Sequence, residues 1–367
     1  MVPTDPAHIL KSQDVVTGVA RFLSNQQDPH VPGYVRYSAS GDLFSDHQKT
    51  NLAGSIFALK LYAMLGETDQ KRIQPIVDRV LSFQRPDGSF ADPYVCKKRF
   101  IRNTLSSLKH RDLSNLGNQS YIRAETRQAY SALLLHHVLP HKVDANIPTT
   151  PQAIHTFLSR LDWTRPWGAG SHFSHLLFFL SLFKKTKKLT QEQYLEARSS
   201  ACTFIASLQH EDGAWYTGNP SHRQKVNGAM KVISGLIVDD LPFEHPKELI
   251  NLCLTQEATQ THDACDQINQ ILVLRYSTRL LNHPYHQEDI NTFCQNALIQ
   301  WGAYYFPEHG GFSFHKHRAN DRYYSAKVSQ GLNEPDIHGT ILFVWGLSMM
   351  KQLLQTENLP NFHEIKS

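Results

Sequence analysis

Two kinds of helical segment alternate along the chain. In the first kind, apolar residues recur at positions i, i+3, i+4 and i+7 and leave a charged face, which is typical of a helix with one side in solvent. Six segments show this pattern: residues 14–26, 69–84, 150–161, 190–209, 245–256 and 286–302. We find no sustained period-two alternation, so the pattern predicts very little strand.

The second kind of segment begins with polar residues and is then apolar on nearly every side, which indicates a buried helix. Its six members are residues 49–65, 123–139, 170–183, 225–238, 263–277 and 335–350. Because the two kinds alternate strictly, they predict an all-α fold in which six buried helices form an inner ring and six amphipathic helices an outer ring. We expect this (α/α)6 toroid to occupy residues 1–367 as a single domain.

The starts of the inner helices are where we expect a functional site. Inner helices of such a toroid run parallel, so their N-termini meet at one mouth of the central cavity. The unpaired backbone N–H groups and the helix dipoles make that mouth favourable for anions. Polar and titratable residues at these helix starts are therefore the candidates for binding and catalysis.

A short turn motif occurs twice in the sequence. Residues 84–90 read QRPDGSF and residues 209–215 read QHEDGAW, so both copies run from Gln through Asp-Gly to an aromatic residue. The Asp-Gly pair favours a tight turn, since Asp bonds its own backbone and Gly accepts a positive φ. A weaker third copy ends at residues 309–312. Each copy lies between an amphipathic helix and the next buried one, where the chain must reverse.

Composition and charge narrow the class of protein. The 367 residues are 41% hydrophobic and 19% charged, as in an ordinary globular protein. The formal net charge of +4 is small for this length, and without a recognisable nucleic-acid motif we expect no nucleic-acid partner. No run of about eighteen apolar residues predicts a membrane span, and no export signal is recognisable at the N-terminus. The five cysteines are irregularly spaced, which favours reduced thiols and a cytoplasmic location.

The repeated glutamine–aromatic turn resembles the repeated motif of terpene cyclases and of protein prenyltransferase β-subunits. The resemblance covers the repeat architecture of most of the chain, although the motif itself occurs only two or three times. It implies the toroid fold and a central pocket. It also implies an enzyme that acts on an isoprenoid or another lipid-like small molecule.

The same resemblance implies zinc as a cofactor. Prenyltransferase β-subunits place Asp-x-Cys at the start of one inner helix and His at the start of the next, and these three residues bind the metal. Here Asp263 and Cys265 open one predicted inner helix, and His338 opens the next. Such a set leaves a fourth position open for a substrate thiol or water. The alternative interpretation is a capping Asp, a core Cys and a structural His.

The chain departs from both branches of the family. Prenyltransferases carry basic residues for the diphosphate upstream of Asp-x-Cys, and residues 255–262 contain none. Terpene cyclases carry Asp-x-Asp-Asp, whose middle Asp donates a proton, and Cys265 stands at that position here. Other residues must then line the pocket and hold an anionic group: Arg123, His172, His222, Arg223, Tyr323 and Tyr324. The remaining acid/base candidates are Glu125, Asp266 and Asp336.

Two other functions stay open at this point. Barrels of the (α/α)6 type also host glycosidases and polysaccharide lyases, which act on sugars through carboxylate, His and Tyr side chains. A toroid can also serve as a non-catalytic binding module, because fold does not determine function. The crowding of titratable groups at the helix starts favours an enzyme.

Overall fold

The computed structural model describes residues 10–100, 119–140, 142–255 and 263–366, and the chain divides into two compact units. Unit 1 comprises residues 1–144, 298–348 and 357–365, and unit 2 comprises residues 145–297, 349–356 and 366–367. Single-domain organisation stays a prediction. Residues 256–262, which belong to the segment without the basic residues of prenyltransferases, lie outside the described residues.

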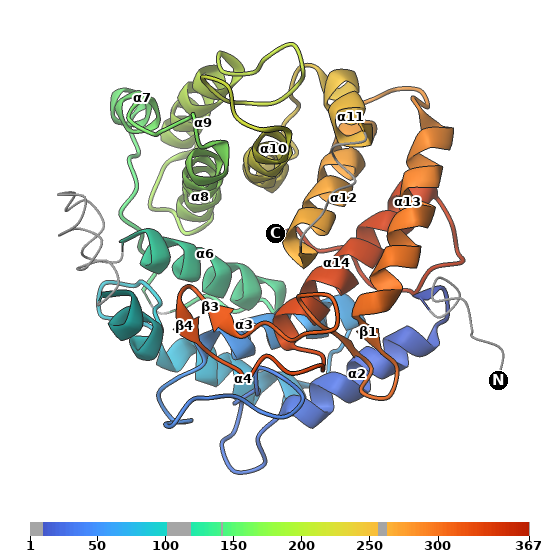
Figure 1. Ribbon diagram of the computed structural model, residues 1–367. Coiled ribbons are helices and arrows are strands. Elements are labelled where there is room, and N and C mark those ends of the chain that lie inside the picture. Colours follow the sequence, from blue (N-terminus) through green and yellow to red (C-terminus); the bar gives the residue numbers. More distant parts are fainter. Residues whose placement is uncertain (1–9, 101–118, 141, 256–262, 367) are drawn as a thin grey trace. The chain divides into compact units, whose positions relative to one another are not determined.

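The fold is all-α, and each predicted helix is present (Figure 1). Unit 1 holds α2 (Asp14–Gln26), α3 (Leu52–Leu65), α4 (Gln70–Ser82), α6 (Gln119–Leu135) and most of α14 (Ile337–Leu354). Unit 2 holds α7 (Pro151–Ser159), α8 (Pro166–Lys185), α9 (Gln191–Ala206), α10 (His222–Leu236), α11 (Pro246–Leu254), α12 (Ala264–Arg279) and most of α13 (Gln287–Trp301). Residues 93–100 form a further helical segment that the hydrophobic pattern did not predict.

The two predicted kinds of helix differ in burial as expected. Helix α3 is buried continuously from Leu52 to Tyr62, so it has no solvent face along that length. Helix α9 buries Tyr194, Ala197, Ala201 and Ile205, which form a single stripe at a spacing of three or four residues. In unit 1, α3 contacts α2, α4 and α6; in unit 2, α10 contacts α8 and α12 (Figure 1). The buried helices thus pack against both their own kind and the amphipathic kind.

Capping residues explain where the helices begin. Ser221 and Gln224 form a capping box, so α10 starts at His222, earlier than its apolar pattern suggested. The side chain of Asp263 accepts a hydrogen bond from the backbone N–H of Asp266 and caps α12. Asp263 therefore has the capping role that was the alternative to zinc ligation.

The two copies of the turn motif have the same hydrogen bonds. In each copy the Gln side chain donates to the carbonyl of the turn Gly, at 3.2 Å for Gln84 and 2.9 Å for Gln209. The same amide also donates to a backbone carbonyl in the next connection, at Lys142, nine residues before α7, and at Glu244, two residues before α11. The terminal aromatic residues of both copies are fully buried. The second copy therefore ties the end of α9 to the start of α11, and the first copy ties the end of α4 to the loop at Lys142.

Three turn glycines lie against an amphipathic helix. Gly213 has φ +83°, and a Cβ there would lie 2.7 Å from Leu249 in α11. Gly33 lies in a similar turn that lacks the sequence motif. It has φ +73°, and a Cβ there would lie 2.0 Å from the carbonyl oxygen of Pro75 in α4. In the last copy, a Cβ on Gly310 (φ +82°) would lie 2.1 Å from the carbonyl oxygen of Gly18 in α2. Within unit 1 the last turn therefore packs against the first helix.

Residues 302–336 form two small hairpins that the sequence did not predict. Strand β1 (Tyr305–Phe306) pairs with β2 (Gly311–Phe312), and β3 (Arg322–Tyr323) pairs with β4 (Ala326–Lys327), both antiparallel. Each strand has only two residues, which is too short to produce a period-two pattern. No helix of the described residues is long and apolar enough to cross a membrane.

We expect Gly310→Ala to lower the free energy of unfolding by about 2–5 kcal/mol, because left-handed strain of about 1–2 kcal/mol adds to overpacking of about 1–3 kcal/mol. Gly41 is the matched control, since it also has a positive φ (+118°) but no atom within 4 Å of an added Cβ. Gly41→Ala should therefore lower the free energy of unfolding only by the backbone strain of about 1–2 kcal/mol. Urea denaturation of both variants measures the difference, and equal costs would show that the contact with α2 contributes nothing.

Candidate functional site

A fully buried acid lies on α6 in unit 1. Glu125 has no exposed surface, and its Oε2 atom accepts a hydrogen bond of 2.7 Å from the hydroxyl of Tyr323. Its other oxygen, Oε1, has no hydrogen-bond partner among the described residues. A buried carboxyl with one unpartnered oxygen is unusual, because buried polar atoms are generally hydrogen-bonded.

The surroundings of Glu125 favour its protonated form. Burial raises its pKa to about 8, the neighbouring charge of Asp92 adds to the increase, and the Tyr323 hydrogen bond and Lys60 oppose it. Burial also raises the pKa of Tyr323 well above its usual value, so this hydroxyl keeps its proton and donates it to Oε2. The proton of the neutral carboxyl then resides on Oε1, the oxygen without a partner.

A group of aromatic rings and one histidine adjoins this acid. The ring of His338 stacks on Phe57 at a centroid distance of 4.9 Å, and Phe314 lies 4.7 Å from it on a tilted plane. Tyr323 approaches His338 at 6.1 Å and Phe57 at 6.0 Å, both edge to face. We call Glu125, Tyr323, His338, Phe57 and Phe314 the Glu125 cluster. All five belong to unit 1.

Hydrogen bonds orient the imidazole of His338. The side-chain amide of Asn320 donates to Nδ1 at 3.1 Å and to the hydroxyl of Tyr37 at 3.1 Å, and that hydroxyl lies 3.4 Å from Nδ1. Because Asn320 Oδ1 accepts from the backbone N–H of Arg322, the amide is oriented with its nitrogen toward the histidine. Nδ1 is therefore an acceptor and Nε2 carries the proton. Burial lowers the pKa of His338 to about 3, so the ring is neutral at pH 7.

The tight loop that carries Tyr323 is strained. Tyr324 and Ser325 connect β3 to β4 with φ values of +46° and +87°. Positive φ at both positions is typical of a type I′ turn, which Asn-Gly adopts far more easily than a bulky residue. The ring of Tyr324 packs edge-on against Tyr323 at 4.8 Å and against Tyr121 of α6 at 4.9 Å. Backbone strain of this kind is frequent at functional sites.

Asp336, the second acid/base candidate, organises the backbone. Its Oδ1 accepts from the N–H of Gly339, and its Oδ2 accepts from the N–H groups of Phe314 and Asn320, all within 2.9 Å. Burial raises its pKa to about 6, and these backbone donors oppose the increase. Asp336 therefore holds Phe314, Asn320 and the start of α14 together, which positions the rings around His338.

Asp266, the third candidate, is paired within unit 2. The guanidinium of Arg223 reaches both carboxylate oxygens, at 3.0 and 2.9 Å from Nε, and Nη2 lies 2.8 Å from Oδ2. Asn227 donates to Oδ1 at 2.9 Å and accepts from Asn269 at 2.8 Å. This pair fixes Arg223, whose side chain is 54% exposed and has a raised pKa because of Asp266. Asp266 is thus an anchor for a cation that can hold an anionic group.

The other predicted pocket residues have local contacts. His222 lies with Nε2 2.7 Å from the carbonyl oxygen of Leu252, so it links α10 to the end of α11. His172 meets the edge of Phe157 at a centroid distance of 6.1 Å. Arg123 lies on α6, where burial lowers its pKa. Of the predicted set, the structure brings together Glu125, Tyr323, Tyr324 and His338, and separately Arg223 and Asp266.

The predicted zinc ligands divide between the two units, with Asp263 and Cys265 in unit 2 and His338 in unit 1. Burial raises the pKa of the Cys265 thiol to about 12. A zinc-bound His normally donates its second N–H to an acceptor, whereas His338 receives a hydrogen bond at Nδ1 and bears its proton on Nε2. The donors around His338 therefore do not fit zinc binding through Nε2. In the described part of the chain, no group of three or more His, Cys, Asp or Glu side chains is arranged to hold a metal.

Several residues of the site were not predicted. Tyr37, Phe57, Phe314 and Asn320 lie in loops or within an apolar helix, where nothing in their spacing distinguishes them. Tyr37 meets Asn320 and His338 across about 300 positions of sequence. A single sequence carries no signal for such long-range contacts.

Comparisons with known proteins found no match: no protein-family model, no curated protein and no solved structure is similar to this chain.

The raised pKa of Glu125 predicts a pH-dependent stability. The folded state holds its proton up to about pH 8 and the unfolded chain only to about 4.5, so this stabilisation is complete below pH 4.5 and is lost as the pH rises through 8. Between pH 7 and 9, we expect the wild type to lose about 1 to 1.5 kcal/mol relative to Glu125→Gln.

Chemical denaturation at several pH values measures that difference. His338 and Asp336 do not disturb this window, because their pKa values of about 3 and 6 lie below it. Glu196→Gln, at an exposed position on α9, is the control and should follow the wild type. Parallel pH curves for Glu125→Gln and the wild type would contradict the assignment.

Proposed function

We propose that the protein is an enzyme that transfers a proton to an isoprenoid or other lipid-like small molecule, with Glu125 as the general acid. The observation that carries this proposal is the neutral carboxyl of Glu125, fully buried and with Oε1 unpartnered among the described residues. An acid with a pKa near the operating pH is the most effective proton donor. Glu125 would thus be the proton donor in place of the middle Asp of the terpene-cyclase motif, the position that Cys265 occupies here.

The chemical step follows from the two oxygens of Glu125. The π electrons of a substrate alkene form a new C–H bond with the proton of Oε1, leaving a cation on the adjacent carbon and a carboxylate on Glu125. The Tyr323 hydroxyl donates to Oε2 and stabilises that carboxylate. Loss of a proton from a neighbouring carbon to the carboxylate restores the acid, so the net reaction is an isomerisation or cyclisation.

The rings beside Glu125 suit a carbocation. Phe57, Phe314 and Tyr323 present faces and edges around His338 in a buried setting. Aromatic faces attract cations by about 0.5–2 kcal/mol each, more where water is excluded. His338 is neutral, so it adds no positive charge that would repel the cation. Its Nε2–H is a donor that can orient a polar group of the substrate.

We also propose the (α/α)6 toroid of the terpene cyclase and prenyltransferase type for the whole chain. The alternation of buried and amphipathic helices supports it, as does the repeated turn, which in its second copy ties α9 to the start of α11. The contact of Gly310 with Gly18 supports closure of the ring, since it joins the last turn to the first amphipathic helix.

The sugar-acting and binding-module alternatives have less support. A glycosidase needs two carboxyl groups facing one bond, whereas Asp266 is paired with Arg223 and Asp336 accepts three backbone hydrogen bonds. A binding module gives no reason for an unpartnered buried acid. We derive no step through zinc, because the hydrogen bonds of His338 do not suit it. About one zinc per purified chain, lost in both Cys265→Ala and His338→Ala, would restore that hypothesis.

Deuterium incorporation tests the proposal. A panel of isoprenoid alkenes, isoprenoid diphosphates and oligosaccharides is incubated with the protein in D2O, and the products are analysed by mass spectrometry. We expect an isoprenoid to give a product with deuterium bound to carbon, because the acid step forms a C–H bond. Cleavage of an oligosaccharide without deuterium on carbon would instead establish the sugar-acting alternative.

Variants of the acid separate binding from chemistry. Glu125→Gln should retain substrate binding by thermal shift and lose about 10²–10⁴-fold in kcat, the usual contribution of a general acid. The wild-type rate should fall above pH 8, where Glu125 loses its proton. Glu196→Gln should leave both quantities unchanged. Full turnover by Glu125→Gln would eliminate Glu125 as the acid.

A further inference from the structure

A concave site lies in unit 1, on residues that the Glu125 cluster does not use. It is a groove of about 730 Å³ formed by the loop before α3, the first turn motif, the segment after it and the start of α6. Binding sites for small molecules generally measure about 300–1,000 Å³. The residues that matter for its chemistry are Lys49, Phe83, Arg85, Ala91, Cys96 and Ile122.

One part of the groove is apolar. Phe83 and Ala91 are largely withdrawn from solvent, and Ile122 of α6 and the half-buried Cys96 adjoin them. Burial raises the pKa of the Cys96 thiol, so this residue contributes a neutral surface. The prolines at positions 86 and 93 extend the same surface. An alkyl or aromatic body placed here would remove apolar area from water on both sides.

The rim of the groove is positive. Lys49 and Arg85 are its only charged lining residues within the part of the chain that the structure describes, so no carboxylate faces the groove. Arg85 approaches Asp87 no closer than 4.0 Å, and that carboxylate is largely exposed to solvent. No ion pair with Lys49 is formed among the described residues. An anion between these two cations would compete with Asp87 for Arg85 only across the long, solvent-exposed 4.0 Å pair.

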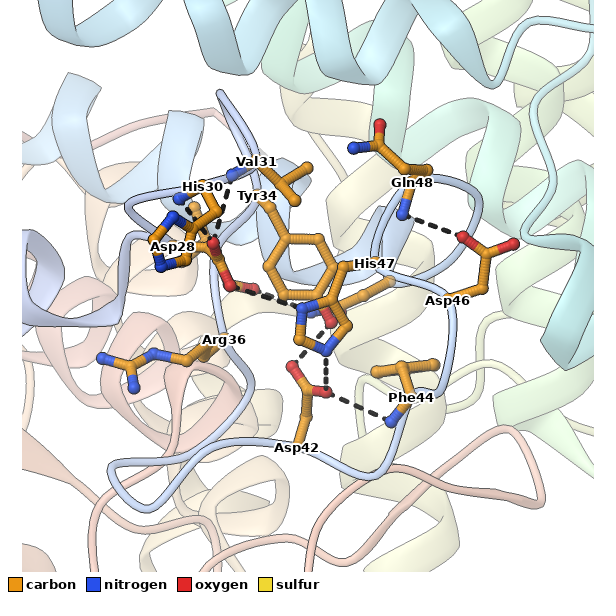
Figure 2. Close-up of polar contacts among 12 residues, drawn as sticks. Asp28, His30, Val31, Tyr34, Arg36, Asp42, Phe44, Asp46, His47 and Gln48 are labelled. Atoms are coloured by element: carbon orange, nitrogen blue, oxygen red, sulfur yellow. Dashed lines mark hydrogen bonds and ion pairs between the residues drawn. The ribbon is translucent and has the colours of Figure 1, made fainter.

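Buried contacts hold the two walls in place. The guanidinium of Arg79, itself 6% exposed, donates to the carbonyl oxygens of His47, Gln48 and Thr50 and fixes the backbone around Lys49. Figure 2 shows further contacts of the same loop, in which the ring of His47 lies between the carboxylates of Asp28 and Asp42. Its two ring nitrogens are 3.3 Å from Asp28 and 3.5 Å from Asp42. Because the backbone is already ordered, a ligand does not need to order it on binding.

The opposite wall is fixed by the turn motif. Gln84 spans the turn and the loop at Lys142, and the backbone N–H of Arg85 donates to the carbonyl oxygen of Ser89. Gly88 (φ +87°) lies against that loop, with an added Cβ only 3.0 Å from Asp144. The repeated turn thus supports a preformed wall as well as the helix connection.

We propose that this groove binds a monomeric amphipathic anion, a molecule with a phosphate or carboxylate head and an apolar body. The head lies between Lys49 and Arg85, and the body lies on Phe83, Ala91 and Ile122. This site is independent of the function proposed for Glu125.

Calorimetric titration with octyl phosphate tests the site. Separate titrations with octanol, which has only the apolar body, and with inorganic phosphate, which has only the anionic head, are the controls. We expect octyl phosphate to bind and each half alone to bind at least about tenfold more weakly, because charge-assisted hydrogen bonds and apolar burial both contribute. The double variant Lys49→Ala/Arg85→Ala should weaken binding of octyl phosphate by about tenfold or more. Lys71→Ala, an exposed cation on α4 outside the groove, should not change it.

Alkylation of Cys96 locates the ligand. At four times its Kd, octyl phosphate should slow the reaction of Cys96 with iodoacetamide about fivefold, since only the unoccupied fraction reacts. Cys202, half-buried in unit 2, is the internal control and should react at an unchanged rate. Equal slowing at both cysteines, or equal affinity of the double variant, would overturn the proposal. Binding to phosphatidic acid vesicles but not to monomeric octyl phosphate would assign the groove to a membrane lipid and overturn it as well.

Discussion

The constraint on which the structure depends is the reversal of the chain after each amphipathic helix. The chain must turn toward a buried helix while leaving room for the next amphipathic helix to pack against the turn. A glycine with positive φ satisfies both needs, because it adopts the left-handed conformation and presents no Cβ. A Cβ added at Gly33 would lie 2.0 Å from Pro75 of α4, one at Gly213 would lie 2.7 Å from Leu249 of α11, and one at Gly310 would lie 2.1 Å from Gly18 of α2. The Gln209 side chain closes the turn at Gly213 with a hydrogen bond, and Gln84 closes the turn at Gly88 in the same way.

The helices between these turns could be predicted from a single sequence. Hydrophobic periodicity over a dozen or more residues is a strong local signal, and all the predicted helices form. The errors lie at the ends, where Ser221 or Asn51 caps a helix a few residues from the edge of its apolar pattern. The hairpins of residues 302–336 were missed, because two-residue strands have no period.

The site could be predicted only in part. Glu125, Tyr323, Tyr324 and His338 were identified because polar residues at the start of an apolar helix, or crowded in one long loop, are conspicuous. Their partners were not, since Phe57 is one apolar residue among many and Tyr37 reaches His338 from a distant loop. From the sequence alone, Glu125, Asp266 and Asp336 were equally good candidates for the general acid. Only the hydrogen bonds separate them, because a carboxyl group that is already paired has no proton to offer.

The energetics of Glu125 explain why such a group indicates function. Burying a carboxyl with one unpartnered oxygen costs about 1–3 kcal/mol, and a well-packed apolar side chain at the same place would avoid that cost. The strained turn at Tyr324 and Ser325 adds a further cost of about 1–3 kcal/mol per residue, and it serves to bring Tyr323 within 2.7 Å of the acid. Two local costs at one point are difficult to explain by stability alone. They are consistent with the proposal that Glu125 stays neutral and dry until a substrate contacts Oε1, which has no hydrogen-bond partner among the described residues.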